Sequence, residues 1–79
     1  GLGASQAHAK PFDQAFIDAM TPHHMMANMM AQAVIKNGSS PEVKQLARKI
    51  VKAQTSEIAQ MKALRGRLYG SSQIPPVPG

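Results

Sequence analysis

Two adjacent histidines and five of the six methionines in this chain lie within eleven residues, between Met20 and Met30. Thioether sulfur is a soft, neutral donor that favours monovalent copper or silver over zinc, magnesium or calcium, and imidazole suits copper as well. A single methionine is an ordinary filler of hydrophobic cores. The density of both donor types favours a soft-metal site, and a methionine-rich surface that contacts another protein is the alternative.

The histidines and methionines lie in the first of two predicted helices. Apolar residues recur every three or four positions from Phe12 to Lys36, which is the helical period. Pro22 should kink this helix, because proline removes a backbone donor and crowds the carbonyl group of Asp18. The alternative is a new helix that starts at Pro22. Asn37-Gly38 is a stop signal, since glycine can take the left-handed conformation.

The second predicted helix runs from Pro41 to Tyr69. Ser40-Pro41-Glu42 supplies a capping hydroxyl, proline at the first position and an acid in the first turn. A loop of about four residues makes the two helices antiparallel neighbours. Because one partner helix cannot cover each apolar stripe fully, we expect two copies to pair as a homodimer. The predicted fold is all-α, a helical hairpin that dimerises into a four-helix bundle.

Helical projection places Met20 and His24 on the stripe predicted to face the second helix. Glu57 and Met61 are four residues apart on the second helix, so both can meet that pair across the hairpin. Asp13 projects onto the same stripe. Polar Gln54 and Arg65 also fall among the apolar positions of the second helix and need partners. The structural alternatives to a metal there are an ion pair between Arg65 and Glu57, or a contact between Asp13 and a histidine.

The other donors of the first helix fall into two further rows. His23, Met26 and Met30 form a row on the flank at steps of three and four residues. Met25 and Met29 project away from the predicted core, where methionine fills no interior space. We expect the flank row to contribute ligands, and the outward pair to offer weaker ones.

Two motifs in this chain resemble a known family. Residues 13–24 read Asp-x-x-Phe-Ile-x-x-Met-x-Pro-His-His, and residues 54–61 read Gln-x-x-Glu-Ile-x-x-Met. At this separation they resemble the domain-of-unknown-function three-hundred-and-five family over about residues 12–65. The resemblance implies a ferritin-like bundle, export from bacterial cells, copper binding and a link to copper tolerance.

The resemblance also implies a set of ligands. It points to Met20, His23, His24 and Met61, with Asp13 and Glu57 as ligands or as groups that orient an imidazole. Relatives commonly have Gln-Gly where this chain has Met25-Met26, and this chain adds Met29-Met30. These four methionines suggest a greater soft-metal capacity than that of a typical relative. Many relatives carry two such repeats, so a single repeat again favours a dimer.

Charge and composition limit the classes of partner that we expect for this chain. Nine Lys and Arg against four Asp and Glu give a net charge of +5, but the basic residues follow one polar face of the second helix, and only Tyr69 could stack on a base near them. We therefore expect no nucleic-acid partner. No apolar run is long enough to span a membrane. The chain begins with Gly, so we expect an export signal to have been removed.

Three segments are expected: a flexible arm over residues 1–10, a metal-binding hairpin over residues 11–70 and a proline-rich tail over residues 71–79. His8 lies in the arm, where nothing nearby has ligand spacing. Cysteine is absent from the chain, which leaves neither a disulfide nor a thiolate site.

The sequence thus predicts a non-enzymatic copper-binding protein that sequesters or transfers Cu(I), and can take Ag(I), in the periplasm or otherwise outside the cytoplasm. Other copper-handling proteins are expected as partners besides the second copy. The alternative function is an interaction module whose methionine-lined hairpin docks on a partner helix without metal. Ferritin-like di-iron oxidation is disfavoured, because the chain has too few inward carboxylates and lacks the Glu-x-x-His motif.

Overall fold

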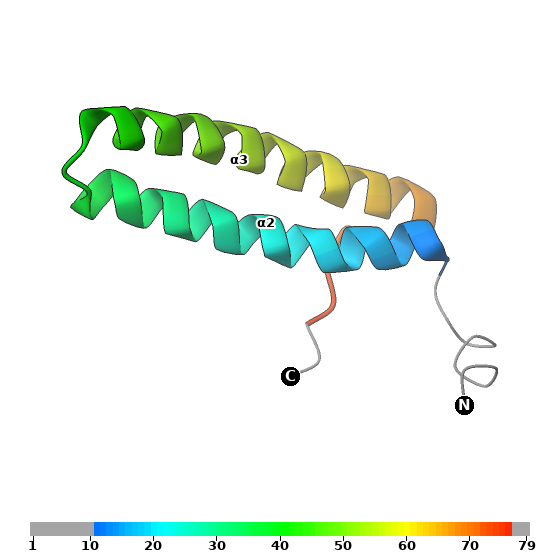
Figure 1. Ribbon diagram of the computed structural model, residues 1–79. Helices are drawn as coiled ribbons and strands as arrows, with labels where there is room; N and C mark the ends of the chain where they lie inside the picture. Colours follow the sequence, from blue (N-terminus) through cyan, green and yellow to red (C-terminus); the bar gives the residue numbers. More distant parts are fainter. Residues whose placement is uncertain (1–10, 77–79) are drawn as a thin grey trace.

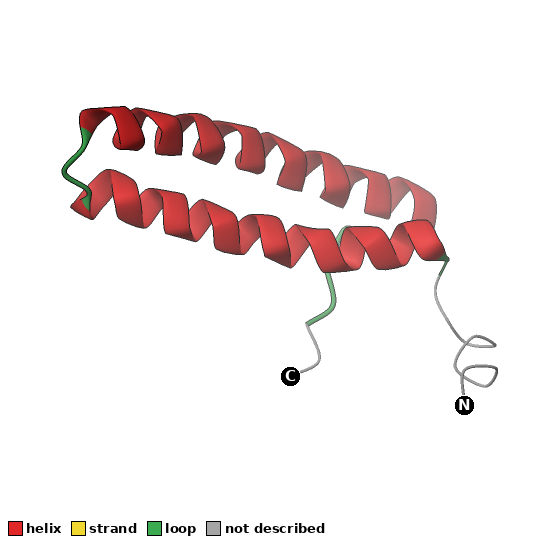
Figure 2. Cartoon of the chain, viewed as in Figure 1, coloured by secondary structure: helices red, strands yellow, loops and turns green. Residues whose placement is uncertain are grey.

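The computed structural model describes residues 11–76, which form two antiparallel helices joined by a short loop. Helix α2 spans Phe12–Asn37 and helix α3 spans Pro41–Tyr69. Figure 1 shows the two helices packed side by side, and Figure 2 shows that the rest of the described chain is loop. The predicted all-α hairpin is confirmed. The arm over residues 1–10, His8 included, and residues 77–79 of the tail lie outside the described residues.

Helix α2 passes through Pro22 without a break. One continuous helix is therefore correct, and the alternative of a new helix at Pro22 is wrong; the kink stays a prediction. Within residues 11–76, neither helix is long and apolar enough to cross a membrane.

The start and end of α3 follow local sequence signals. The Ser40 hydroxyl oxygen accepts a hydrogen bond from the backbone N–H of Val43 at 3.2 Å, and Pro41 occupies the first turn. At the other end Gly70 adopts φ 89°, the left-handed conformation that favours glycine, and its N–H donates to the carbonyl group of Gly66 at 3.0 Å. Both ends of α3 are capped as expected.

Gly38 ends α2 in a different way from the one predicted. Its φ of −71° and ψ of 158° are extended, so the expected left-handed conformation is wrong. Its N–H still donates to the carbonyl oxygen of Val34, at 2.7 Å. A Cβ atom at this position would lie only 2.6 Å from that oxygen. Glycine is thus favoured here by the close approach of two backbone segments, and not by its freedom in φ.

The helices meet along a narrow line of mostly small or polar side chains. Buried residues of this line are Ile17, Thr21 and Ala31 in α2, and Ala47, Met61 and Arg65 in α3. Near the loop the two alanines allow a close approach of the helices. Farther from the loop, Thr21, His24 and Asp18 each contact a residue of α3, and these contacts fix the antiparallel register.

Large apolar side chains remain outside this interface. Phe12 is 85% exposed and Phe16 is 54% exposed, while Leu46 and Leu68 of α3 are 57% and 54% exposed. One partner helix thus leaves part of each apolar stripe uncovered, as expected. The line along which the helices touch passes through Ile17, beside the apolar stripe of α2. The stripes therefore lie on one side of the hairpin.

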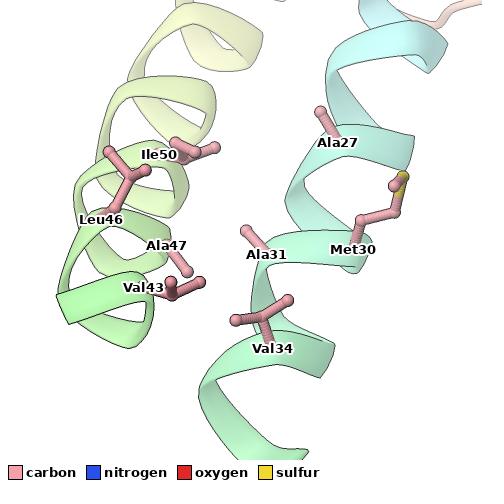
Figure 3. Close-up of a pocket in the computed structure, with 8 residues that line it drawn as sticks. All are labelled: Ala27, Met30, Ala31, Val34, Val43, Leu46, Ala47 and Ile50. Carbon is pink, nitrogen blue, oxygen red and sulfur yellow. The ribbon is translucent and has the colours of Figure 1, made fainter. Parts of the chain in front are cut away.

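This exposed side contains a groove of about 310 Å³ near the loop. Figure 3 shows its lining: Ala27, Met30, Ala31, Val34, Val43, Leu46, Ala47 and Ile50. Phe12 and Phe16 of α2, and Leu64 and Leu68 of α3, lie about five turns away from residues that line this groove. Five turns return a side chain to about the same angle about the helix axis, so these four residues lie on the same side of the hairpin as the groove. We call the combined surface the apolar face; its larger side chains are Phe12, Phe16, Met30, Val34, Val43, Leu46, Ile50, Leu64 and Leu68.

Candidate metal centre

The centre of the candidate site is the imidazole of His24, which is held between the two helices. Its Nδ1 lies 2.9 Å from the carbonyl oxygen of Met20, one turn earlier on α2. Its Nε2 lies 2.7 Å from Oε1 of Glu57 on α3. The His24 side chain is 16% exposed and that of Glu57 is 51% exposed, so the pair lies at the solvent edge of the interface. The predicted meeting of His24 and Glu57 is confirmed.

The hydrogen-bond partners of His24 determine which of its ring nitrogens carry a proton. A carbonyl oxygen only accepts, so Nδ1 must carry a proton and donate to Met20. The Glu57 carboxylate also accepts, so a doubly protonated ring makes both hydrogen bonds. A metal ion at Nε2 would replace the second proton, with Nδ1–H still oriented by the backbone. Metal-binding histidines usually show this arrangement.

Met20 and His23 lie beside this imidazole on α2. Met20 is half-buried and His23 is exposed. Steps of three and four residues place both on the side of α2 that carries Ala27 and Met30, and thus on the apolar face. Glu57 is two turns from Ile50 on α3, which places it at the edge of the same face. Met20, His23, His24 and Glu57 therefore open toward one surface.

Met61 occupies a more enclosed position than the others. It is 8% exposed, and its sulfur accepts a hydrogen bond from the hydroxyl group of Thr21 at 3.6 Å. Thr21 is fully buried, and its single hydroxyl proton is shared with the carbonyl oxygen of Ile17, the nearer acceptor at 2.7 Å. The burial of Met61 limits the access of a metal ion to its sulfur. Its role as a ligand stays a prediction.

Asp13 is not brought to this site. It is exposed in the first turn of α2. Eleven helical residues separate it from His24, which is roughly 16 Å along a continuous helix. Within one chain, Glu57 therefore orients the imidazole, and Asp13 does not.

Sequence reasoning missed a buried ion pair of the hairpin. Arg65 Nε donates to Asp18 Oδ1 at 2.6 Å, and both side chains are almost fully buried. A second donor, Nη1, reaches the carbonyl oxygen of Ser71 at 2.7 Å and ties the segment after α3 to the open end of the hairpin. The hydrogen bond to Asp18 raises the pKa of Arg65 above its usual value, although burial opposes this.

The predicted alternative, a pair between Arg65 and Glu57, is wrong. The antiparallel register places Arg65 opposite Asp18 and Glu57 opposite His24. Gln54, the other polar residue in the apolar pattern, has a buried Oε1 atom without a hydrogen-bond partner. Its need for a partner was foreseen, and no partner for that atom occurs within the described residues.

The remaining methionines are exposed: Met25 by 46%, Met26 by 62%, Met29 by 70% and Met30 by 66%. Met30 lines the groove in Figure 3. Met25 and Met29 were predicted to point away from α3, but they line a second groove together with residues of α3. The rotation of the contact line that exposes Phe16 also brings this pair to the opposite edge of the interface.

No cluster of three or more His, Cys, Asp or Glu side chains that could hold a metal ion occurs within residues 11–76. The donors that the fold brings together at His24 are instead one imidazole and one carboxylate, with a second imidazole and a thioether within one turn of α2. This mixed set suits a soft or borderline ion.

Comparisons with known proteins agree with the motifs. The chain is similar to an uncharacterized protein, L153, of Acanthamoeba polyphaga mimivirus, with 35% identity over 52 residues; the match covers 66% of this chain and 34% of that protein. This chain thus corresponds to about a third of that relative. No solved structure matches it. The family described as a domain of unknown function, DUF305, matches residues 3–65. The chain therefore belongs to the DUF305 family.

Proposed function

We propose that this chain binds Cu(I), and can bind Ag(I), in order to sequester or transfer copper outside the cytoplasm. The observation that carries the proposal is the setting of His24, whose Nδ1 is tied to the Met20 carbonyl oxygen while Nε2 is directed to the exposed edge. The ligands we propose at this edge are His24, His23 and the Met20 sulfur. Met26, Met30 and Met61 remain candidate additional ligands.

The chemistry of these donors supports a monovalent ion. Two imidazoles and a thioether are neutral or borderline-soft ligands, so they favour Cu(I) over magnesium or calcium. Glu57 lies at Nε2 and would supply negative charge beside the ion, while the Met20 carbonyl oxygen holds the ring through Nδ1. This geometry supports binding and release rather than catalysis. An extracytoplasmic role is supported by the same chemistry, because thioethers hold copper without thiols that oxidation would consume.

We further propose that two copies pair through the apolar face into a four-helix bundle. Eight of the nine larger side chains of this face are exposed in the single chain, and exposed apolar surface of this kind marks an interaction site. A second copy has the same face and can cover it by two-fold symmetry. Since His23 and Met20 lie on this face, pairing would also shield the bound ion from water. Copper-handling proteins that deliver or receive the ion would then approach the edge at Glu57.

The binding proposal is tested by titration with Cu(I) against a chromophoric chelator, in anaerobic buffer. We expect the chain to compete with the chelator, and the double variant His23→Ala with His24→Ala to lose at least tenfold in affinity. The variant Gln14→Ala with Gln60→Ala makes comparable truncations away from the site and should bind like the parent. Circular dichroism checks that each variant keeps its helices. Equal affinity of the parent and the histidine variant would refute the site.

The apolar groove favours one other function. A methionine-containing, apolar groove between two helices is the kind of surface on which an amphipathic helix of another protein docks. This interaction module requires no metal. Failure of the parent chain to compete for Cu(I) would leave this function as the better one.

A further inference from the structure

The side of the hairpin opposite the apolar face has a groove of its own. It is lined by Met25, Asn28 and Met29 of α2 and by Thr55 and Ile58 of α3. Met25 is 46% exposed and Met29 is 70% exposed, so solvent and small ions reach both side chains. The two methionines are one turn apart, and side chains at this spacing are neighbours on a helix.

These two thioethers lie on a different side of the hairpin from the edge where Met20 and His23 lie. Met30 lines the groove of the apolar face, and Met29 lines the groove on the other side. Met25 is likewise about 200° around the helix from His23. The two sides of α2 therefore present separate sets of soft donors.

The rest of this groove gives the two sulfurs a defined setting. The Asn28 amide donates to the Thr55 hydroxyl oxygen of α3 at 3.5 Å and accepts a hydrogen bond from Gln32 at 3.4 Å. Ile58 supplies an apolar wall. Half-exposed methionines fill no space in a core, and leucine would pack against Ile58 as well as methionine does. Methionine differs from leucine at these two positions by a polarizable sulfur that can bind a soft metal ion.

We infer that Met25 and Met29 form a second binding site for a soft monovalent ion, Cu(I) or Ag(I), independent of the site at His24. This inference extends the proposed function from one ion to two per chain. The second site should be the weaker, because it has two neutral ligands and no carboxylate comparable to Glu57. Pairing through the apolar face would leave it exposed, so it is the site from which an ion can exchange with other proteins or with small thioether ligands.

The test uses Ag(I), which is redox-stable, with the full chain labelled with carbon-13 at the methionine methyl groups. Each of the six methyl resonances reports one sulfur in an NMR titration. We expect the Met25 and Met29 resonances to shift together. They should do so at a higher Ag(I) concentration than the one that shifts the Met20 resonance. Mass spectrometry under native conditions should then count two bound ions per chain.

Two variants separate this site from the first one. Met25→Leu with Met29→Leu conserves volume and should bind one ion, with the Met20 response unchanged. His23→Ala with His24→Ala should keep the Met25 and Met29 response and also bind one ion. Unmoved Met25 and Met29 resonances, or two ions bound to the leucine variant, would overturn the inference. Loss of the Met20 response alone would instead refute the site at His24 and leave the second site standing.

Discussion

Replacement of Leu46 by alanine should weaken the proposed dimer strongly while leaving the hairpin intact. Leu46 is 57% exposed in the single chain, where it contributes little to the packing of α3 against α2. It lines the groove at the centre of the apolar face near the loop. Alanine has the highest helix propensity, so the change should not disturb α3 itself.

The size of the effect follows from the exposed fraction. Full burial of a leucine side chain contributes about 1.5–3 kcal/mol. Burial of the 57% that remains exposed therefore contributes about 1–1.5 kcal/mol per chain. A two-fold interface contains Leu46 twice, so the variant should lose about 2–3 kcal/mol of dimer stability. This corresponds to an increase in the dimer dissociation constant of about 30- to 150-fold.

Sedimentation equilibrium over a range of concentrations measures this dissociation constant directly. Met29→Ala is the matched control, since Met29 is 70% exposed but lines the groove on the other side of the hairpin, and it should leave the dissociation constant unchanged. A parent chain that stays monomeric at micromolar concentration, with and without metal, would refute the reasoning. So would a Leu46→Ala variant that dimerises as tightly as the parent.

Three further changes test the hairpin that positions the site. Thr21→Val keeps the shape but removes the buried hydroxyl, and should lower the free energy of unfolding by about 1 kcal/mol in urea denaturation. Asp18→Asn leaves the buried guanidinium of Arg65 without its charged partner, so thermal unfolding should occur at a lower temperature than in the Asp13→Asn control, whose carboxylate is exposed. Gly38→Ala should destabilise the loop, because its Cβ would meet a backbone oxygen at 2.6 Å; no loss of stability by calorimetry would contradict the close approach.

Local signals were sufficient to predict the helices. The capping serine, the proline at the first position of α3 and Gly70 after its last turn each act within a few residues. Their effect does not depend on what packs against the helix. The bounds of both helices, and hence the antiparallel hairpin, could therefore be predicted from the chain alone.

The rotation of the helices about their axes could not be predicted in the same way. Helical periodicity identifies an apolar stripe but not the surface that covers it. Phe12 and Phe16 belong to the apolar stripe of α2, but Ile17 and Thr21 make the contact with α3. Arg65 lies in the same contact and is satisfied by Asp18, a partner that depends on the register, whereas the Thr21 hydroxyl donates to Ile17 within its own helix.

The candidate site was predicted best where two residues form one short contact. His24 and Glu57 meet as expected, because their places on each helix and the loop length fix the pair. Met25 and Met29 were misplaced, because their direction depends on the rotation of α2. Helical periodicity predicts the apolar stripes, but it does not predict on which side of the interface the metal donors at the edges of these stripes lie.

The most direct test of copper binding is the X-ray absorption spectrum of the chain loaded with one equivalent of Cu(I). The ligand set at His24 predicts a coordination shell with both imidazole nitrogen and thioether sulfur, and loss of the imidazole contribution in the variant His23→Ala with His24→Ala. A shell of oxygen or nitrogen alone, or copper that leaves the protein during gel filtration, would contradict the proposed function.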